Sequence, residues 1–371
     1  MRALVVRPPA PSAHLADLPV PTLGPGEVRV RVLECGVCGT DHDIVEGQYG
    51  KPPEGSSELI LGHENLGRVQ ETGASVSGWT PGQLVVATVR RSCNACRFCR
   101  SGQSDFCETG RYTERGIFGR SGYMAEQYVE VPDYLVAVPE ELRPVAVMLE
   151  PMSVAEKAIV EGQRALDRKE PTPGFPRTEP LRALVAGTGA IGILASLILR
   201  LRGYTVTAID RHDGSTPAGQ LLAVMGVRHV NAAVGTSALG ADRFDLVVEA
   251  TGAIALDFDL LGLLAINGVL VLTGIPNARA PPIPVAAGAL LRQMVLANQA
   301  IVGSVNANRS YFEAGVRDFT EAHRRWPGLL ERFVTRRRPL EEFLDVLGHR
   351  EGGAIKNVLV VDPSDPPRAV T

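Results

Sequence analysis

Four cysteines lie close together in the first third of the chain, in the pattern Cys93-x2-Cys96-x2-Cys99-x7-Cys107. Four thiolates at this spacing can form a tetrahedral cage around Zn²⁺, and a site closed by four protein ligands is structural because no position is left for a substrate. Buried metal-free thiols and an iron–sulfur cluster are the alternatives. The spacing therefore predicts a structural zinc site, which alone says nothing about activity.

A glycine-rich segment, Gly187-Thr188-Gly189-Ala190-Ile191-Gly192, follows the apolar run Leu181–Ala186 and opens a predicted helix. The first glycine permits a tight turn, the second lets the backbone approach a pyrophosphate, and the third allows close helix–strand packing. The helix N-terminus supplies free N–H groups for the phosphates. Alone, such a segment is often only a turn, but Asp210 also ends the next predicted strand. A carboxylate there binds a ribose 2′-OH and favours NAD, whereas Arg211 could meet the 2′-phosphate of NADP, so we expect either dinucleotide.

Three further segments could build a second metal site: Cys38-Gly39-Thr40-Asp41, Gly62-His63-Glu64 and Glu150-Pro151. A thiolate, an imidazole and a carboxylate can hold one Zn²⁺ and leave a position open for substrate, as catalysis requires. Each residue also has an ordinary structural interpretation, as a core thiol, a core histidine or a carboxylate at a helix start. Spacing alone leaves both interpretations open.

Composition limits the partners of these sites. The chain has 371 residues, of which 45% are hydrophobic and 21% charged, and this length and composition indicate two or three globular domains. The net charge of −3 gives no electrostatic reason to expect nucleic acid or an anionic membrane. The pair Arg90-Arg91 near the cysteines suggests nucleic acid, but the net charge argues against it. No transmembrane segment or signal peptide is expected, which suggests a cytoplasmic protein, and the six cysteines are then expected to stay reduced.

The elements that must position these residues change in character along the chain. Strands are expected at Val28–Val32, Leu84–Val89 and Tyr128–Val131, followed by a helix at Val145–Gly162 and a proline-rich linker between Asp167 and Pro180. Beyond the linker, strands and helices alternate, which indicates a doubly wound parallel sheet. Its expected strands are Leu181–Ala186, Thr205–Ile209, Leu246–Glu249, Val269–Thr273 and Ala300–Gly303, with helices from the glycine-rich segment to Arg202 and at Ala218–Met225. A helix at Tyr311–Arg324 and a strand at Lys356–Val361 end the pattern.

One motif makes the chain recognisable. Gly62-His63-Glu64-x2-Gly67-x5-Gly73-x2-Val76 matches the zinc-containing alcohol dehydrogenase signature. With the cysteine and glycine-rich segments, the chain resembles the medium-chain dehydrogenase/reductase superfamily over nearly its whole length. The resemblance implies an α/β protein with a GroES-like, β-rich catalytic domain (1–180 and 306–371) and a Rossmann dinucleotide-binding domain (181–305).

Within the superfamily the chain resembles archaeal-type glucose 1-dehydrogenases. The matching segments are Cys38-Gly39-Thr40-Asp41, Asp105-Phe106-Cys107-Glu108-Thr109-Gly110, Glu114-x-Gly116-Ile117, Glu150-Pro151 with Glu156-Lys157, and Gly303-x2-Asn306. The resemblance implies that Cys38, His63 and Glu150 ligate a catalytic zinc, with Glu64 nearby as an intermittent ligand or in contact through water. It also implies that Asp41 orients His63 and that Thr40 relays a proton. The implied sugar contacts are Thr40, Glu114, Glu150 and Asn306, and the expected cofactor contacts also include Thr251, Thr273, Gly303 and Val305.

The expected reaction is oxidation of an aldose, D-glucose and also D-galactose or related sugars, at C1 to the lactone, with hydride transfer to NAD or NADP. Val89 and Val154 replace polar sugar contacts of some relatives, which predicts weak discrimination among sugars. A polyol or other alcohol dehydrogenase is the nearest alternative. A catalytically silent zinc- and nucleotide-binding interaction protein is a more distant one. A homodimer or homotetramer is expected by family analogy.

Overall fold

The computed structural model describes residues 1–167, 179–233, 235–276, 281–348 and 354–367. They form two compact units, one of residues 1–153, 306–323 and 330–371 and one of residues 154–305 and 324–329. The division falls inside helix α3 (Leu149–Asp167). The domain boundaries expected from the sequence remain a prediction, and the expected linker between Asp167 and Pro180 lies almost wholly outside the described residues.

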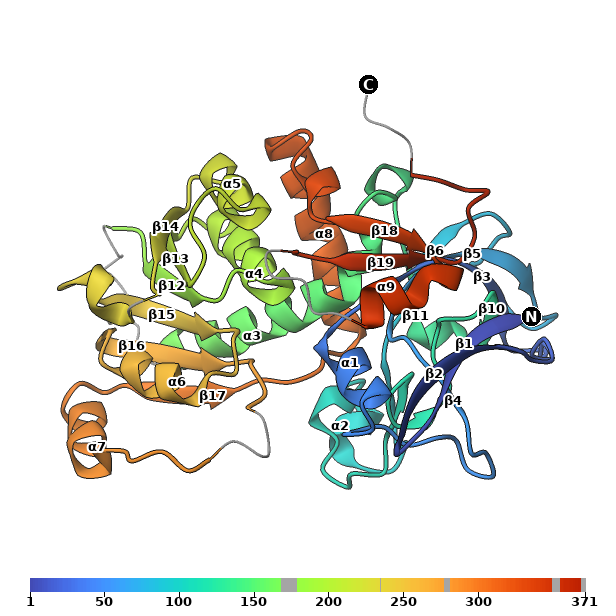
Figure 1. Cartoon of the computed structure of the whole chain (residues 1–371), viewed down its shortest axis with the longest axis horizontal. Coiled ribbons are helices and arrows are strands. Elements are labelled where there is room, and N and C mark those ends of the chain that lie inside the picture. The colour runs from blue at the N-terminus through green and yellow to red at the C-terminus, as the bar shows by residue number, and fades with distance from the viewer. Residues whose placement is uncertain (168–178, 234, 277–280, 349–353, 368–371) are drawn as a thin grey trace. The chain divides into compact units, whose positions relative to one another are not determined.

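The first unit is built mainly from β-strands (Figure 1). Its largest sheet has the order β11-β6-β5-β3-β19-β18, and β10 also pairs with β3. Smaller sheets have the orders β2-β1-β4 and β7-β8-β9. The strands are β1 (Arg2–Arg7), β2 (Ala10–Asp17), β3 (Val28–Val37), β4 (Leu59–Ile60), β5 (Glu64–Thr72), β6 (Leu84–Ala87), β7 (Arg90–Arg91), β8 (Thr113–Arg115), β9 (Gly119–Arg120), β10 (Gln127–Glu130), β11 (Leu135–Ala137), β18 (Arg336–Pro339) and β19 (Asn357–Val360). The helices are α1 (Gly39–Val45), α2 (Arg97–Arg100), α8 (Arg309–Arg325) and α9 (Phe343–Leu347).

The central strand β3 shows how the sequence forms this sheet. Val28, Val30 and Val32 are fully buried, while Arg29 and Arg31 between them are partly exposed. This alternation is typical of a strand with one face on the core. The strand continues to Val37, five residues beyond the prediction, because its second half is buried throughout. It therefore ends directly before Cys38.

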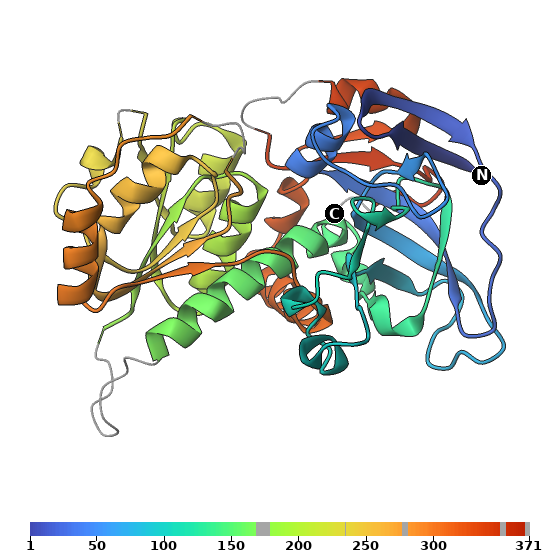
Figure 2. The same cartoon turned by 90° about the horizontal axis from the view of Figure 1, so that it is seen from below.

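The second unit contains a six-stranded sheet in the order β14-β13-β12-β15-β16-β17, and every pairing in it is parallel. Helices lie on both sides of these strands (Figures 1 and 2). The predicted doubly wound sheet is confirmed. The strands are β12 (Arg182–Ala186), β13 (Thr205–Asp210), β14 (Arg228–Asn231), β15 (Phe244–Glu249), β16 (Leu264–Leu272) and β17 (Ala300–Gly303), and the helices are α4 (Ala190–Leu201), α5 (Pro217–Val224), α6 (Ile254–Leu261) and α7 (Ala287–Leu296).

Most predicted elements are present with shifted ends. Strand β6 stops at Ala87, two residues before the predicted end, so Val89 lies outside the observed strand. The expected helix start at Val145 was wrong, because a 3-10 turn (Ala146–Met148) precedes α3, which then runs five residues past Gly162. Strand β14 was not predicted. No helix in the described part of the chain has the length and apolar character needed to span a lipid bilayer.

Candidate active site

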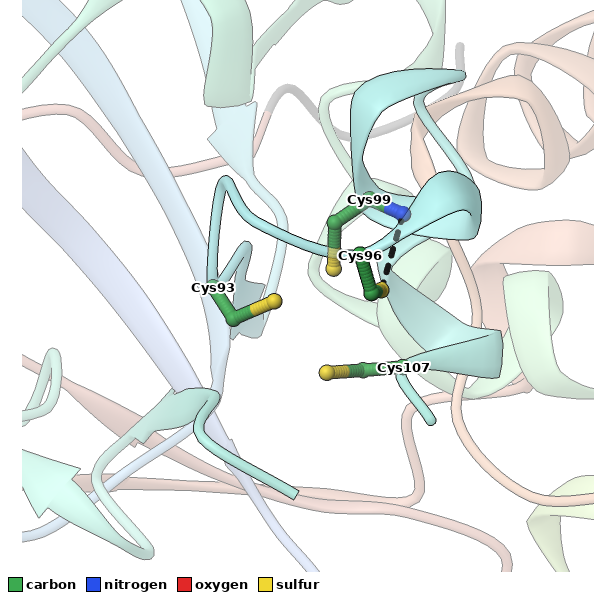
Figure 3. Close-up of side chains that lie close together, drawn as sticks. All are labelled: Cys93, Cys96, Cys99 and Cys107. Carbon is green, nitrogen blue, oxygen red and sulfur yellow. Dashed lines mark hydrogen bonds between the residues drawn. The ribbon is translucent and has the colours of Figure 1, made fainter. Parts of the chain in front are cut away.

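The four clustered cysteines converge as their spacing predicts. Their sulfur atoms lie within 4.8 Å of one another, and Figure 3 shows the side chains of Cys93, Cys96, Cys99 and Cys107 pointing into one shared space. Helix α2 begins here because the Cys96 sulfur accepts the backbone N–H of Cys99 at 3.4 Å. This donor set and spacing fit a closed tetrahedral zinc site.

The charges of this cluster also call for a cation. The Thr109 hydroxyl and the backbone N–H groups of Ala95 and Cys96 lower the pKa of the Cys93 thiol to about 5. Burial raises the pKa of the Cys99 thiol to about 11. Four thiolates cannot all ionise side by side without a positive charge among them, and a bound Zn²⁺ supplies it.

A second cluster joins Cys38, His63 and Glu64, whose ligand atoms also lie within 4.8 Å of one another. Cys38 is the N-cap of α1, and Glu64 is the first residue of β5, directly after His63. The Cys38 sulfur lies 2.9 Å from His63 Nε2. The ends of two neighbouring elements thus bring a thiolate, an imidazole and a carboxylate together, which is a donor set suited to zinc.

Asp41 lies beside the imidazole of this cluster. Its Oδ1 lies 3.4 Å from His63 Nδ1, and its Oδ2 accepts the backbone N–H of Cys38 at 3.0 Å. Such a carboxylate–histidine contact fixes the ring so that the opposite nitrogen faces the metal position. Burial lowers the pKa of His63, but the Cys38 thiolate and the Asp41 carboxylate together raise it well above its ordinary value. The negative groups around His63 therefore favour a positive charge at this position, which a proton on the ring or a bound metal ion can supply.

Lys356 is a charged residue of this site that sequence reasoning missed. Its Nζ donates to both carboxylate oxygens of Glu64, at 2.6 and 2.7 Å, and to the Val37 carbonyl at 3.2 Å. Glu64 fits here because residue 36 is glycine, where a Cβ would lie 2.0 Å from Glu64 Oε2. The sequence contained one signal for this residue: only four lysines occur in the chain, and Lys356 is the first residue of an expected strand.

Glu150 does not belong to the three-residue cluster, which contains Glu64 instead. It lies in the first turn of α3, where burial raises its pKa to about 7, with Glu64 also raising it and His63 lowering it. Its role as a zinc ligand stays a prediction. Thr40 lies in α1, where its backbone N–H donates to the Cys38 sulfur at 3.3 Å.

The two expected sugar contacts Glu114 and Asn306 meet, although 192 residues separate them along the chain. Asn306 Nδ2 donates to Glu114 Oε1 at 2.6 Å. Asn306 has a left-handed backbone (φ 58°), which is uncommon for a residue other than glycine and concentrates at functional sites. Val89 is buried, at 2% exposure.

In the second unit, the glycine-rich segment connects β12 to α4 as predicted. Gly187 has φ 96°, and a Cβ on Gly192 would lie 1.9 Å from the Gly187 carbonyl oxygen, so both positions require glycine. Asp210 Oδ2 accepts the backbone N–H and the hydroxyl of Thr188, both at 2.9 Å. Its Oδ1 lies 2.6 Å from His212 Nδ1. Asp210 thus lies against the segment that would hold the phosphates, and Arg211 beside it is exposed.

The other expected cofactor residues lie at the carboxyl ends of the same parallel strands, where such sheets bind ligands. Glu249, the last residue of β15, contacts two of them and was not predicted as a site residue. One of its carboxylate oxygens accepts the Thr251 hydroxyl at 2.5 Å, and its backbone carbonyl accepts the Thr273 hydroxyl at 2.6 Å. Gly303 ends β17, and the Val305 carbonyl accepts Lys157 Nζ at 3.0 Å.

A GroES-like unit with two metal-ligand clusters and a Rossmann unit define a zinc-dependent medium-chain dehydrogenase. Family models described as "Alcohol dehydrogenase GroES-like domain" and "Glucose dehydrogenase C-terminus" match residues 24–140 and 143–361. The chain belongs to the glucose dehydrogenase family.

Named relatives agree with this assignment. The chain is 42% identical to glucose 1-dehydrogenase of Methanocella arvoryzae, over 92% of this chain and 94% of that one. It is 41% identical to glucose 1-dehydrogenase of Thermoproteus tenax, over the same shares. The solved structure of Haloferax mediterranei glucose dehydrogenase in complex with NADP, Zn and gluconolactone matches with a TM-score of 0.85 and 32% identity, covering 98% of this chain and 99% of that chain.

Proposed function

We propose that this protein oxidises D-glucose and related aldoses at C1 to the lactone, with transfer of hydride to a nicotinamide dinucleotide. The observation that carries the proposal is the presence, within one unit, of the Cys38–His63–Glu64 cluster and of the Glu114–Asn306 pair. The first supplies ligands for a Lewis acid, and the second supplies polar groups suited to sugar hydroxyls. Relatives named glucose 1-dehydrogenase support the choice of substrate.

The chain's own residues would divide the work. Cys38 and His63 would hold the zinc together with Glu64 or Glu150, and the bound ion would polarise the C1 hydroxyl oxygen so that its proton leaves near neutral pH. Asp41 keeps the His63 ring in place. We assign Thr40 and Glu64 to passing the proton toward solvent. The glycine-rich segment from Gly187 to Gly192 would position the dinucleotide, which supplies the hydride chemistry.

For the cofactor, we propose that NAD is accepted alongside NADP. The Asp210 carboxylate lies at the end of β13, where it can accept from a ribose 2′-OH and where its negative charge opposes a 2′-phosphate. Arg211 beside it provides the opposing positive charge. The relative from Haloferax mediterranei is in complex with NADP, and we propose that the balance between Asp210 and Arg211 sets the preference of this chain.

The test is a matrix of initial rates on the zinc-loaded protein, with D-glucose, D-galactose and D-xylose, each with NAD and NADP, followed by nicotinamide absorbance. We expect turnover on glucose that a chelator abolishes and added zinc restores. Turnover on polyols but on none of the aldoses would replace the proposal with the polyol alternative. Absence of turnover on any alcohol, with zinc and dinucleotide both bound, would favour the catalytically silent binding protein.

We also propose a homo-oligomer that forms through the β17 edge of the parallel sheet. Strand β17 is the last of its sheet, and exposed apolar side chains lie on it, on α7 before it and just after it in the chain: Leu291, Val295, Leu296, Ile301 and Val305. An unpaired edge with apolar neighbours suits pairing with the same edge of a second copy around a two-fold axis. Light scattering after chromatography tests this, since Val295→Lys should then yield monomers and a monomeric wild type would refute it.

We place the enzyme in the cytoplasm. All six cysteines are free thiols in the structure, and four of them form the predicted zinc cage, which requires a compartment that keeps thiols reduced. Fractionation with an antibody against the chain tests the assignment.

A further inference from the structure

Arg90 is a buried cation whose charge faces the expected sugar-binding carboxylate. It lies on β7, directly opposite Glu114 on β8. Its Nε and Nη2 donate to Glu114 Oε1 at 3.1 and 2.9 Å. The two residues are 7% and 5% exposed, so this contact is little screened by water.

The pair leaves the two oxygens of Glu114 in different states. Oε1 accepts three donors, two from Arg90 and the third from Asn306 Nδ2 at 2.6 Å. Among the described residues, no hydrogen-bond donor reaches Oε2, and this atom is not one of the polar atoms sealed from solvent without a partner. Since a carboxylate oxygen offers two lone pairs, Oε1 has no capacity left. A sugar hydroxyl can therefore be accepted only by Oε2.

The position of Arg90 is itself fixed by the cysteine segment. Its Nη1 donates to the Asp105 carbonyl at 3.1 Å, and its guanidinium stacks on the Tyr112 ring with 3.8 Å to the centroid. Asp105 lies two residues before Cys107, and its Oδ1 accepts Asn308 Nδ2 at 2.9 Å. Hydrogen bonds thus connect Asn306 through Glu114, Arg90 and Asp105 to Asn308. Asn308 is only two residues along the chain from Asn306, so the backbone closes the ring.

We propose that Arg90 is the positioning residue of the sugar site: it fixes Glu114 so that Oε2 alone faces the substrate, and it connects that carboxylate to the four-cysteine segment. This inference rests on the proposed aldose oxidation. Arg90 donates through two nitrogens to one oxygen, a geometry that the single ammonium of lysine cannot reproduce. Without Arg90, Glu114 can rotate and present either oxygen, so orientation for a hydroxyl is lost.

The chain offers a matched control in the next residue. Arg91 lies on the same strand, is 5% exposed, and pairs with Glu130 at 2.5 Å while its guanidinium stacks on the Tyr134 ring. It therefore has the burial, the ion pair and the aromatic contact of Arg90 but does not contact Glu114. A substitution there tests whether damage to this strand is enough to disturb the sugar site.

The experiment compares wild type, Arg90→Gln, Arg90→Lys, Glu114→Gln, the double variant Arg90→Gln/Glu114→Gln and the control Arg91→Lys, each checked for zinc content and melting temperature. Two quantities are measured: KM and kcat for D-glucose, and the Kd for 1,5-anhydro-D-glucitol by calorimetry. This sugar lacks the C1 hydroxyl and cannot react, so its Kd reports recognition alone.

We expect Arg90→Gln to raise KM and this Kd by about 10- to 100-fold, the worth of a charge-assisted hydrogen bond, with a much smaller change in kcat. Arg90→Lys should recover part of the loss. In the Glu114→Gln background, Arg90→Gln should add nothing, because Arg90 acts through Glu114. Arg91→Lys should lower the melting temperature and leave KM and Kd unchanged.

Several results would overturn the inference. They are an unchanged KM in folded Arg90→Gln, additive effects in the double variant, and an equal rise of KM in Arg91→Lys. If Arg90→Gln does not fold, Arg90→Lys decides, and an unchanged KM and Kd there refutes the role. If the wild type turns over no aldose and binds no anhydroglucitol, both the proposed function and this inference are refuted. If the wild type is active on glucose and the Arg90 variants have normal KM and Kd, only this inference is refuted.

Discussion

The buried pair of Lys356 and Glu64 gives a prediction whose size follows from the structure. The two side chains are 3% and 1% exposed, and Lys356 Nζ reaches both carboxylate oxygens and the Val37 carbonyl. Lys356→Met keeps the length of the side chain but leaves the Glu64 carboxylate buried without its cation. Removing one partner of a buried ion pair costs about 3–5 kcal/mol, because the remaining charge is uncompensated.

A second substitution separates this cause from a packing defect. Glu64→Gln in the Lys356→Met background removes the orphaned charge while the shape of the side chain is nearly kept. Replacing both members of a buried pair is often close to neutral, so the double variant should regain most of the lost stability. Lys356→Met alone should then be the less stable of the two.

The assay is urea unfolding of the metal-free protein, in which no zinc beside Glu64 replaces the lost cation, followed by circular dichroism at one fixed protein concentration. Arg7→Met serves as the control, because Arg7 pairs with Glu58 at 2.6 Å while its side chain is 59% exposed. Exposed pairs contribute less than about 1 kcal/mol, so this variant should unfold with the wild type. A Lys356→Met protein within about 1 kcal/mol of wild type, or a double variant no more stable than the single one, would refute the reasoning.

Three further predictions concern the metal site, acid stability and the cofactor. Cys38→Ala or His63→Ala should abolish turnover and keep the circular dichroism spectrum, and full activity in either would contradict the catalytic zinc assignment. Burial raises the pKa of Glu130, but Arg91 and Arg115 outweigh it and lower the pKa to about 2 from an ordinary 4.5. A depressed carboxyl pKa stabilises the fold above pH 4.5, and this contribution is lost as pH falls toward 2. The difference is worth about 3 kcal/mol, so Glu130→Gln should lower stability at pH 7 and flatten its dependence between pH 5 and pH 2, measured by urea unfolding; an unchanged profile would contradict it. Asp210→Asn should raise kcat/KM with NADP relative to NAD by about tenfold, the effect of removing one carboxylate charge beside a 2′-phosphate, and a ratio that does not move would exclude Asp210 from the choice.

The parallel sheet was the part of the fold that sequence patterns predicted best. Residues 183–186 of β12 are fully buried, and such a strand appears as a continuous apolar run. Strand β14 escaped prediction because Arg228-His229-Val230-Asn231 contains one apolar residue and lies at the sheet edge, where burial no longer selects for apolar side chains. In the first unit the strands are short and have irregular ends, so the sequence predicted only that this part of the chain is rich in β-strands.

The residues of the candidate site were also predictable only in part. The four cysteines lie within fifteen residues, so their spacing alone predicts the cluster. Cys38 and His63 required family resemblance, because local spacing does not show that separate segments meet. Lys356 is 292 residues from Glu64, and nothing local marks the partnership. Arg90 and Arg91 suggested a nucleic-acid contact when their charges were counted without partners, whereas both are buried in ion pairs with glutamates.

Glu64 and Glu114, two of the buried glutamates of the first unit, show why pairing geometry, and not charge alone, determines what a carboxylate can do. Lys356 occupies both oxygens of Glu64. Each of these oxygens accepts a single donor and keeps a second lone pair, so Glu64 can approach a metal or a proton while it stays paired with Lys356. Arg90 and Asn306 occupy a single oxygen of Glu114. Its second oxygen can accept a substrate hydroxyl with no bond broken, which suits recognition.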